Sequence, residues 1–136
     1  MSRPLVGIVV VSHSARVAEG VVEIAAQMAP DVRIVAAGGA PDGSLGEDAT
    51  RIVAAIEEAD AGAGVVVVMD FNGAVYAARM ALQLLDETRA ARVRLSGGPL
   101  VEGAVFGAAQ AGIGDDLDAV LATTEAAAGY NKRVTD

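Results

Sequence analysis

The sequence predicts an α/β protein with a doubly wound, parallel sheet of four strands and helices on both faces, and three observations lead to this fold class. Short apolar runs alternate with longer segments in which apolar residues recur every three or four positions. The short runs lack polar alternation, which is typical of strands covered on both faces. The chain has 136 residues, enough for one core, so we expect a single domain over residues 1–136.

The first half of the chain predicts two strand-helix units. A continuous β-branched run over residues 5–11 is followed by residues 15–28, where apolar side chains share one face and glutamates occupy the other. A proline and an aspartate end this helix, and residues 32–36 predict a shorter strand. After a glycine-rich loop, either Ser44 or Asp48 can cap the second helix.

The second half predicts two further units and a closing helix. Residues 65–69 give the clearest strand pattern, because five apolar residues follow the glycines that end the second helix. The remaining segments are a helix over residues 75–86, a strand over 93–95, helices over 100–111 and 115–128, and a polar tail over 129–136. This alternation requires right-handed crossovers, and we expect the strand order 2-1-3-4.

Composition and length argue against several functions. A net charge of -8, with nine scattered arginines and one lysine, opposes binding to nucleic acid. The absence of cysteine excludes thiolate catalysis, cysteine-ligated zinc and disulfides. The apolar runs are too short to span a bilayer, and the first lacks a signal-peptide cleavage pattern. We therefore expect a cytoplasmic protein that binds neither membranes nor nucleic acid.

Motifs for direct use of nucleotides are also missing. No Gly-x-x-x-x-Gly-Lys-Ser/Thr occurs, and no Gly-x-Gly-x-x-Gly follows the first strand. A receiver domain would need an acidic pair after the first strand and a lysine near a later strand, and the chain has neither. We therefore expect no resident cofactor and no metal.

Polar residues follow the first and third predicted strands, where ligands bind in this architecture. Ser12, His13 and Ser14 follow the first strand, and His13 is the single histidine of the chain. They lie directly before a helix N-terminus, whose free N–H groups favour an anion. Asp70 follows the third strand. With the order 2-1-3-4, His13 and Asp70 project into the same crevice.

This pairing suits a phosphohistidine. A carboxylate that accepts from Nδ1–H leaves Nε2 unprotonated and stabilises the cation that forms when Nε2 attacks phosphorus. We therefore assign His13 and Asp70 as candidate catalytic residues. Ser12, Ser14 and Arg16 are candidates to bind the phosphoryl oxygens.

Simpler interpretations of these residues also exist. A single histidine is often structural, and Asp70 or Asn72 can serve as a turn or capping residue. The glycine pairs at 38–39 and 97–98 are typical of turns. A non-catalytic module that binds a small anion in the same crevice is therefore the alternative from another class of function.

Residues 9–14, Val-Val-Val-Ser-His-Ser, with Ala-Glu-Gly at 18–20, resemble the opening of the mannose-type EIIA phosphocarrier domains of the bacterial phosphoenolpyruvate-dependent phosphotransferase system. Within that family, the chain is similar to the branch that serves phosphoenolpyruvate-dependent dihydroxyacetone kinases, and the similarity covers nearly the whole chain. The segments that carry it are residues 42–46, 67–70, 80–86 and 98–104. The chain departs from this branch at Phe71-Asn72-Gly73, where Leu-Gly-Ser is more frequent, and at Glu47, where threonine is frequent.

The resemblance implies the mannose-type EIIA fold and a role as a phosphocarrier. It implies that His13 accepts a phosphoryl group from HPr and transfers it to ADP held in a separate subunit, DhaL. The ATP formed there then phosphorylates dihydroxyacetone on a third subunit, DhaK. It also implies a homodimer and, with the chain ending at Asp136, the single-domain form. The alternative within this class is an EIIA component of a sugar-transport system.

Overall fold

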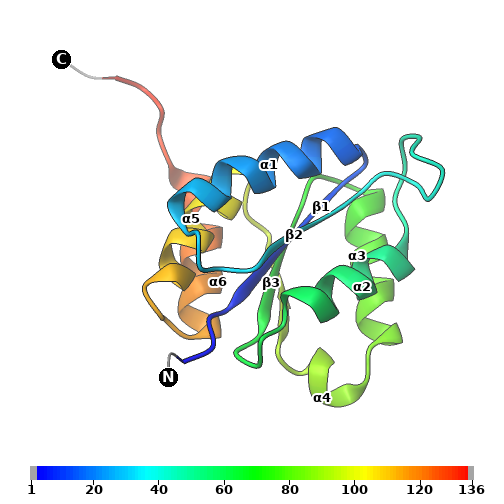
Figure 1. The fold of residues 1–136 in the computed structure, drawn as a ribbon. Helices are drawn as coiled ribbons and strands as arrows, with labels where there is room; N and C mark the ends of the chain where they lie inside the picture. Colours follow the sequence, from blue (N-terminus) through cyan, green and yellow to red (C-terminus); the bar gives the residue numbers. More distant parts are fainter. Residues whose placement is uncertain (1–2, 135–136) are drawn as a thin grey trace.

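The computed structural model describes residues 3–134, and its four strands form one parallel sheet in the order β2-β1-β3-β4 (Figure 1). The strands are β1 (Gly7–Ser12), β2 (Ile34–Gly38), β3 (Val65–Met69) and β4 (Val93–Leu95). The predicted fold class and strand order are confirmed. The two central strands are therefore β1 and β3, the strands that the candidate catalytic residues follow.

Helices cover both faces of this sheet. They are α1 (Ala15–Met28), α2 (Ala49–Ala59), α3 (Gly73–Leu84), α4 (Glu87–Ala90), α5 (Leu100–Gly112) and α6 (Leu117–Ala126), followed by the 3-10 turn η1 (Ala127–Gly129). One layer is formed by α1, α5 and α6, and the other by α2 and α3 (Figure 1). Each layer buries its own hydrophobic core against the sheet.

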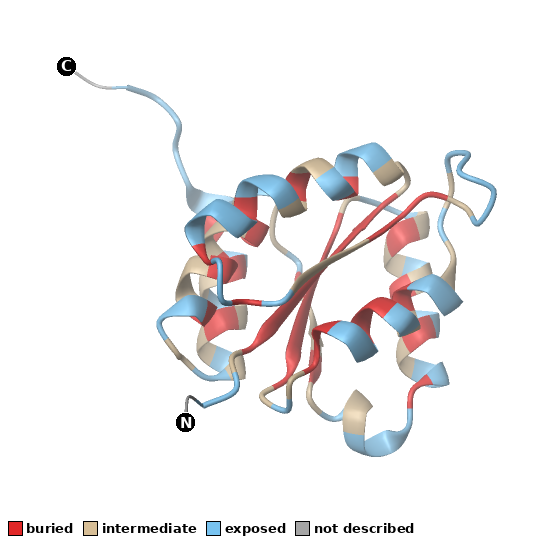
Figure 2. Cartoon of the chain, viewed as in Figure 1, coloured by how far each residue is buried: buried red, intermediate tan, exposed pale blue. Residues whose placement is uncertain are grey.

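The central strands belong to both cores because successive side chains of a strand point to opposite faces. Ile8 and Val10 of β1 pack with α1 and α5, whereas Val9 and Val11 pack with α2 and α3. Every residue of β1 and β3 is buried, as Figure 2 shows in red. Burial on both faces explains why these runs lack polar alternation. It also gives the loops that follow them a rigid base.

The structure differs from the prediction mainly at element ends. β2 begins two residues later than expected and continues to Gly38, because it pairs with β1 as far as Ser12. Asp48, rather than Ser44, caps α2 and accepts a hydrogen bond from the Thr50 N–H at 3.0 Å. The expected helix over residues 75–86 is α3, which already ends at Leu84. The separate turn α4 was not predicted.

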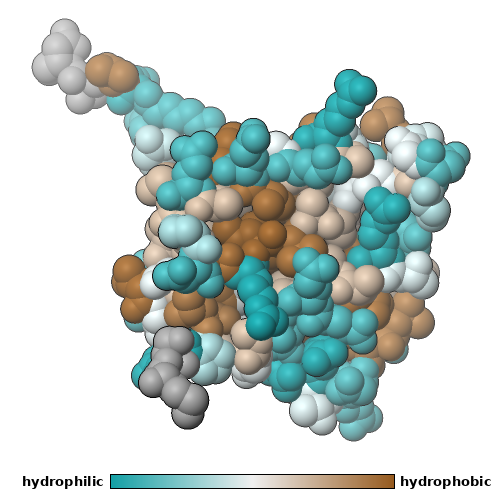
Figure 3. Space-filling view, in the orientation of Figure 1, coloured by the Kyte–Doolittle hydropathy of each residue, from teal (hydrophilic) through white to brown (hydrophobic). Residues whose placement is uncertain are grey.

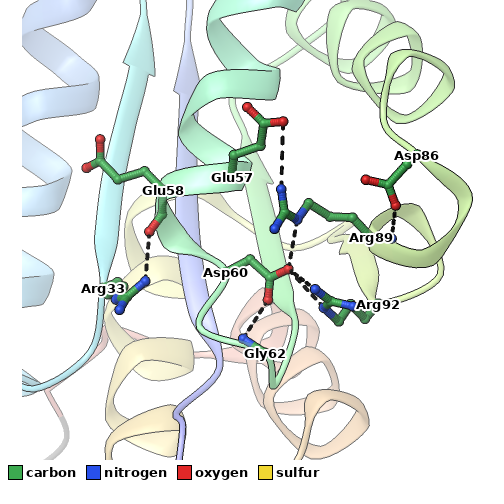
Figure 4. Close-up of polar contacts among 8 residues, drawn as sticks. All are labelled: Arg33, Glu57, Glu58, Asp60, Gly62, Asp86, Arg89 and Arg92. Atoms are coloured by element: carbon green, nitrogen blue, oxygen red, sulfur yellow. Dashed lines mark hydrogen bonds and ion pairs between the residues drawn. The ribbon is translucent and has the colours of Figure 1, made fainter.

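An ionic cluster lies between the end of α2 and the start of β4 (Figure 4). The side chain of Asp60 is fully buried. Its carboxylate accepts hydrogen bonds from Arg89 Nε at 3.1 Å and from Arg92 Nε at 2.9 Å. It also accepts from the Gly62 N–H at 2.9 Å. Burial raises the pKa of Asp60, but the hydrogen bonds from Arg92, Gly62 and Arg89 outweigh this effect and lower it. The cluster ties α2 to α4 and to the residue before β4.

The edge strand β2 leaves apolar surface uncovered. Ile34, Val35 and Ala36 are partly exposed, and Figure 3 shows hydrophobic residues gathered on this face beneath α1. The opposite edge of the sheet is the short strand β4. Within residues 3–134, no helix has both the length and the apolar character needed to cross a membrane.

Candidate active site

The structure brings His13 and Asp70 together at the carboxyl ends of the two central strands. Val11 of β1 lies beside Met69 of β3, and the Asp70 N–H donates to the Val11 carbonyl at 3.1 Å. This backbone bond places the Asp70 carboxylate next to the residue that follows β1. Its Oδ1 lies 3.0 Å from His13 Nδ1.

The Asp70 carboxylate also accepts three hydrogen bonds beyond the imidazole contact. The backbone N–H of His13 and the hydroxyl of Ser12 both donate to Oδ2 at 2.9 Å. The Phe71 N–H donates to Oδ1 at 2.7 Å. Burial raises the pKa of Asp70, but these donors together with the His13 imidazole outweigh burial and lower it. Asp70 is therefore an ionised acceptor, which selects the His13 tautomer with hydrogen on Nδ1.

The two serines beside His13 are held by local hydrogen bonds. The Ser12 hydroxyl is buried, donates to Asp70 and accepts from the Ser14 N–H at 3.0 Å. The Ser14 hydroxyl caps α1 by accepting from the Val17 N–H at 3.2 Å. Arg16 is exposed on the first turn of α1, and no ion pair joins it to another residue of the described range 3–134. Phosphoryl binding by Ser12, Ser14 and Arg16 stays a prediction.

Two residues that we did not assign to the site contact the imidazole. Glu47 Oε2 lies 3.3 Å from His13 Nε2, and its side chain is 28% exposed. The Phe71 ring stacks on the imidazole, with ring centroids 4.5 Å apart and planes inclined by 20°. The Gly46 N–H donates to the His13 carbonyl at 2.9 Å, which brings Glu47 close to the ring. Glu47 lies in the loop after β2 and Phe71 lies in the loop after β3, and both strands are neighbours of β1. This position in the predicted strand order was the signal in the sequence that could have assigned them to the site.

Asp70 also lines a pocket of about 320 Å³, and His13 is not among the residues that line it. Arg79 of α3 and the turn Ser96-Gly97-Gly98 after β4 complete its polar lining. Asp70 and one cationic side chain, Arg79, therefore line the same pocket. Within residues 3–134, no three histidine, cysteine, aspartate or glutamate side chains gather as a metal site.

The arrangement gives one nitrogen a chemical role. With Nδ1–H donating to an ionised carboxylate, Nε2 carries the lone pair, and 27% of the His13 side chain is exposed. The carboxylate can also stabilise the positive charge that develops on the ring when Nε2 attacks an electrophile. An imidazole held in this way has the orientation that nucleophilic catalysis requires, and the catalytic roles of His13 and Asp70 stay predictions.

The sequence that forms this fold matches the model of a known family. The family model described as the PTS system fructose IIA component, EIIA-man, matches residues 7–121. The chain therefore belongs to the EIIA-man family.

Its curated relatives define a narrower group. It is 40% identical over 121 residues to the PEP-dependent dihydroxyacetone kinase, phosphoryl donor subunit DhaM, of Escherichia coli, which covers 86% of this chain and 26% of that protein. The chain thus spans about a quarter of the length of this relative. It is 34% identical to a Listeria innocua DhaM subunit, covering 86% of this chain and 94% of that protein.

A solved structure confirms the fold. The crystal structure of EF1359, a protein of unknown function, superimposes with a TM-score of 0.82 at 36% sequence identity. The match covers 90% of this chain and 95% of that one.

Proposed function

We propose that this chain is the phosphoryl donor subunit of a phosphoenolpyruvate-dependent dihydroxyacetone kinase. In this role it accepts a phosphoryl group from HPr on Nε2 of His13 and transfers it to ADP bound in a DhaL subunit. The ATP formed there phosphorylates dihydroxyacetone on DhaK. The relatives named DhaM support the assignment to this kinase, and the contact between His13 and Asp70 supports phosphoryl transfer through His13.

The observation that carries this proposal is the contact of 3.0 Å between His13 Nδ1 and Asp70 Oδ1. It assigns the lone pair to Nε2 and aligns the ring with a carboxylate that is itself fixed by backbone N–H groups. An in-line transfer between imidazole and phosphorus asks little more of a protein than orientation and charge stabilisation.

In the loading step, the Nε2 lone pair of His13 attacks the phosphorus of the phosphorylated donor. A nitrogen-phosphorus bond forms at Nε2 while the bond between phosphorus and the donor breaks, and the electron pair of the broken bond returns to the donor. In the unloading step, a terminal phosphate oxygen of ADP attacks the same phosphorus, and the bond electrons return to Nε2. The Nδ1 proton stays between the ring and Asp70 in both steps.

This role sets the partners that the chain needs. Donor and acceptor both approach Nε2, so they bind one after the other. The nucleotide stays with the acceptor, and the chain itself holds only a transient phosphohistidine. The proposal also includes a cytoplasmic location and a homodimer, which the family resemblance implies.

Labelling with radioactive phosphoenolpyruvate, Enzyme I and HPr tests the proposal. The unchanged chain should take up acid-labile phosphate and lose it when DhaL with ADP is added. His13→Gln should take up none. Labelling that persists in His13→Gln would contradict the assignment of this residue. Loss of the label to a sugar-specific EIIB protein, but not to DhaL, would place the chain in sugar transport.

A further inference from the structure

Glu47 occupies the space in front of the reactive nitrogen. Its Oε2 lies 3.3 Å from His13 Nε2. Its carboxyl group also fills the space beside Gly73, the first residue of α3, where an added Cβ would lie 2.3 Å from Glu47 Oε1. The carboxylate is therefore enclosed between the imidazole and the N-terminus of a helix, a position that favours negative charge.

A phosphoryl group on Nε2 would need this same space. It carries a charge near -2 at neutral pH and three acceptor oxygens. Asp70 holds Nδ1, so Nε2 is the nitrogen that must bind phosphorus. A carboxylate oxygen in contact with Nε2 and a phosphoryl group bonded to Nε2 exclude each other, both by volume and by like charge.

We propose that Glu47 is a displaceable carboxylate that takes the place of the phosphoryl group when His13 is unphosphorylated. This inference rests on the proposed function and concerns the regulation of the same site. In the unphosphorylated protein, Glu47 supplies the negative charge next to the ring. In the phosphorylated protein it is displaced and repels the phosphoryl group.

The consequence concerns equilibrium rather than docking. Glu47 repels a doubly charged phosphoryl group far more strongly than it repels a neutral imidazole, so it destabilises the phosphorylated site relative to the unphosphorylated one. It therefore shifts phosphoryl exchange away from His13 and towards the acceptor. Glu47 has room to leave, because 28% of its side chain is already exposed. Glu47 is thus a positioning residue that sets the phosphoryl-transfer potential.

The experiment measures the equilibrium constant for transfer of the phosphoryl group from HPr to the chain. It is obtained at one fixed pH from the equilibrium concentrations of HPr and of the chain, each in its phosphorylated and unphosphorylated form. This constant does not depend on how fast or how tightly the two proteins dock. In Glu47→Gln, which keeps the shape and removes the charge, we expect the constant to rise about three- to tenfold towards the phosphorylated chain. In Glu47→Asp, which keeps the charge but is one methylene shorter, we expect an intermediate value.

Glu58→Gln is the matched control. Glu58 is an exposed residue near the opposite end of α2, so the variant changes the net charge equally without touching His13. We expect it to leave the exchange constant unchanged. An equal or smaller constant in Glu47→Gln than in the unchanged chain, or an equal rise in Glu58→Gln, would overturn the inference. If the unchanged chain takes up no phosphate on His13, the proposed function itself fails.

Discussion

Asp70 holds His13 at two points, since its Oδ1 lies 3.0 Å from the imidazole Nδ1 while its Oδ2 accepts the His13 backbone N–H at 2.9 Å. The Asp70 carboxylate thus fixes the imidazole of His13 relative to the main chain of His13. The ring is bounded by Phe71 on one face and by Glu47 at Nε2. Each of these contacts leads to a measurable expectation.

Asp70→Asn should slow phosphoryl transfer without unfolding the protein. The amide has one acceptor where the carboxylate has two, so it can no longer satisfy the N–H groups of His13 and Phe71 together with Nδ1–H. The tautomer with a lone pair on Nε2 loses its support, and we expect the transfer rate to fall about 100-fold or more. Rapid-quench transfer from labelled HPr measures this, with circular dichroism as the control for folding. An unchanged rate would reduce Asp70 to a turn residue.

Phe71→Ala should loosen the imidazole. The stacked ring restricts His13 to one orientation, and aromatic pairs of this kind contribute about 0.5–1.5 kcal/mol. We expect a roughly three- to tenfold slower transfer and little change in Tm, because the residue is 59% exposed. Tyr76→Ala is the matched control, since Tyr76 is an aromatic on α3 that is 69% exposed. Equal effects of the two substitutions would exclude a specific role for the stack.

Asp60→Asn should destabilise the fold and leave the site intact. The substitution removes the charge that Arg89 and Arg92 share, and these two cations then face a neutral amide. Because both guanidinium groups are partly exposed, we expect a loss of about 2 kcal/mol, which corresponds to a Tm lower by roughly 6–10 °C. Thermal unfolding measures the loss. A Tm within 1 or 2 °C of the unchanged protein would contradict it.

Acid should destabilise the protein through Asp60 and Asp70. Both have a pKa below the usual value for aspartate, so their contribution to stability is complete above about pH 4 and is lost as the pH falls through their lowered values. We expect Tm to decline below about pH 4 and the difference between Asp60→Asn and the unchanged protein to shrink over the same interval. A difference that stays constant down to pH 2.5 would show that Asp60 does not titrate with unfolding.

The fold was predictable because its central strands carry an unambiguous signal. Val65–Met69 and residues 8–11 are uniformly apolar and rich in β-branched side chains, which is typical of strands buried on both faces. The separate turn α4 was missed because its four residues are too few to show a helical period. Its signal is local, as Asp86 accepts from the Arg89 N–H at 2.8 Å and caps it.

The site was predictable only in part, because strand order places some of its residues and loop conformation places the others. His13 and Asp70 directly follow paired strands, so strand order alone brings them together. Glu47 reaches His13 from a loop after β2 whose path depends on backbone hydrogen bonds such as the one from Gly46 to the His13 carbonyl. Hydrophobic periodicity carries no information about such a path. Phe71 follows Asp70 directly, but its ring orientation depends on the turn and not on the strand.

His13 and Asp70 follow the central strands β1 and β3, and neither residue follows the edge strands β2 and β4. The edge strands can therefore pair with an additional strand or contact another domain without displacing the imidazole. Such tolerance suits a unit that recurs both as nearly an entire short protein and as roughly one quarter of a much longer one.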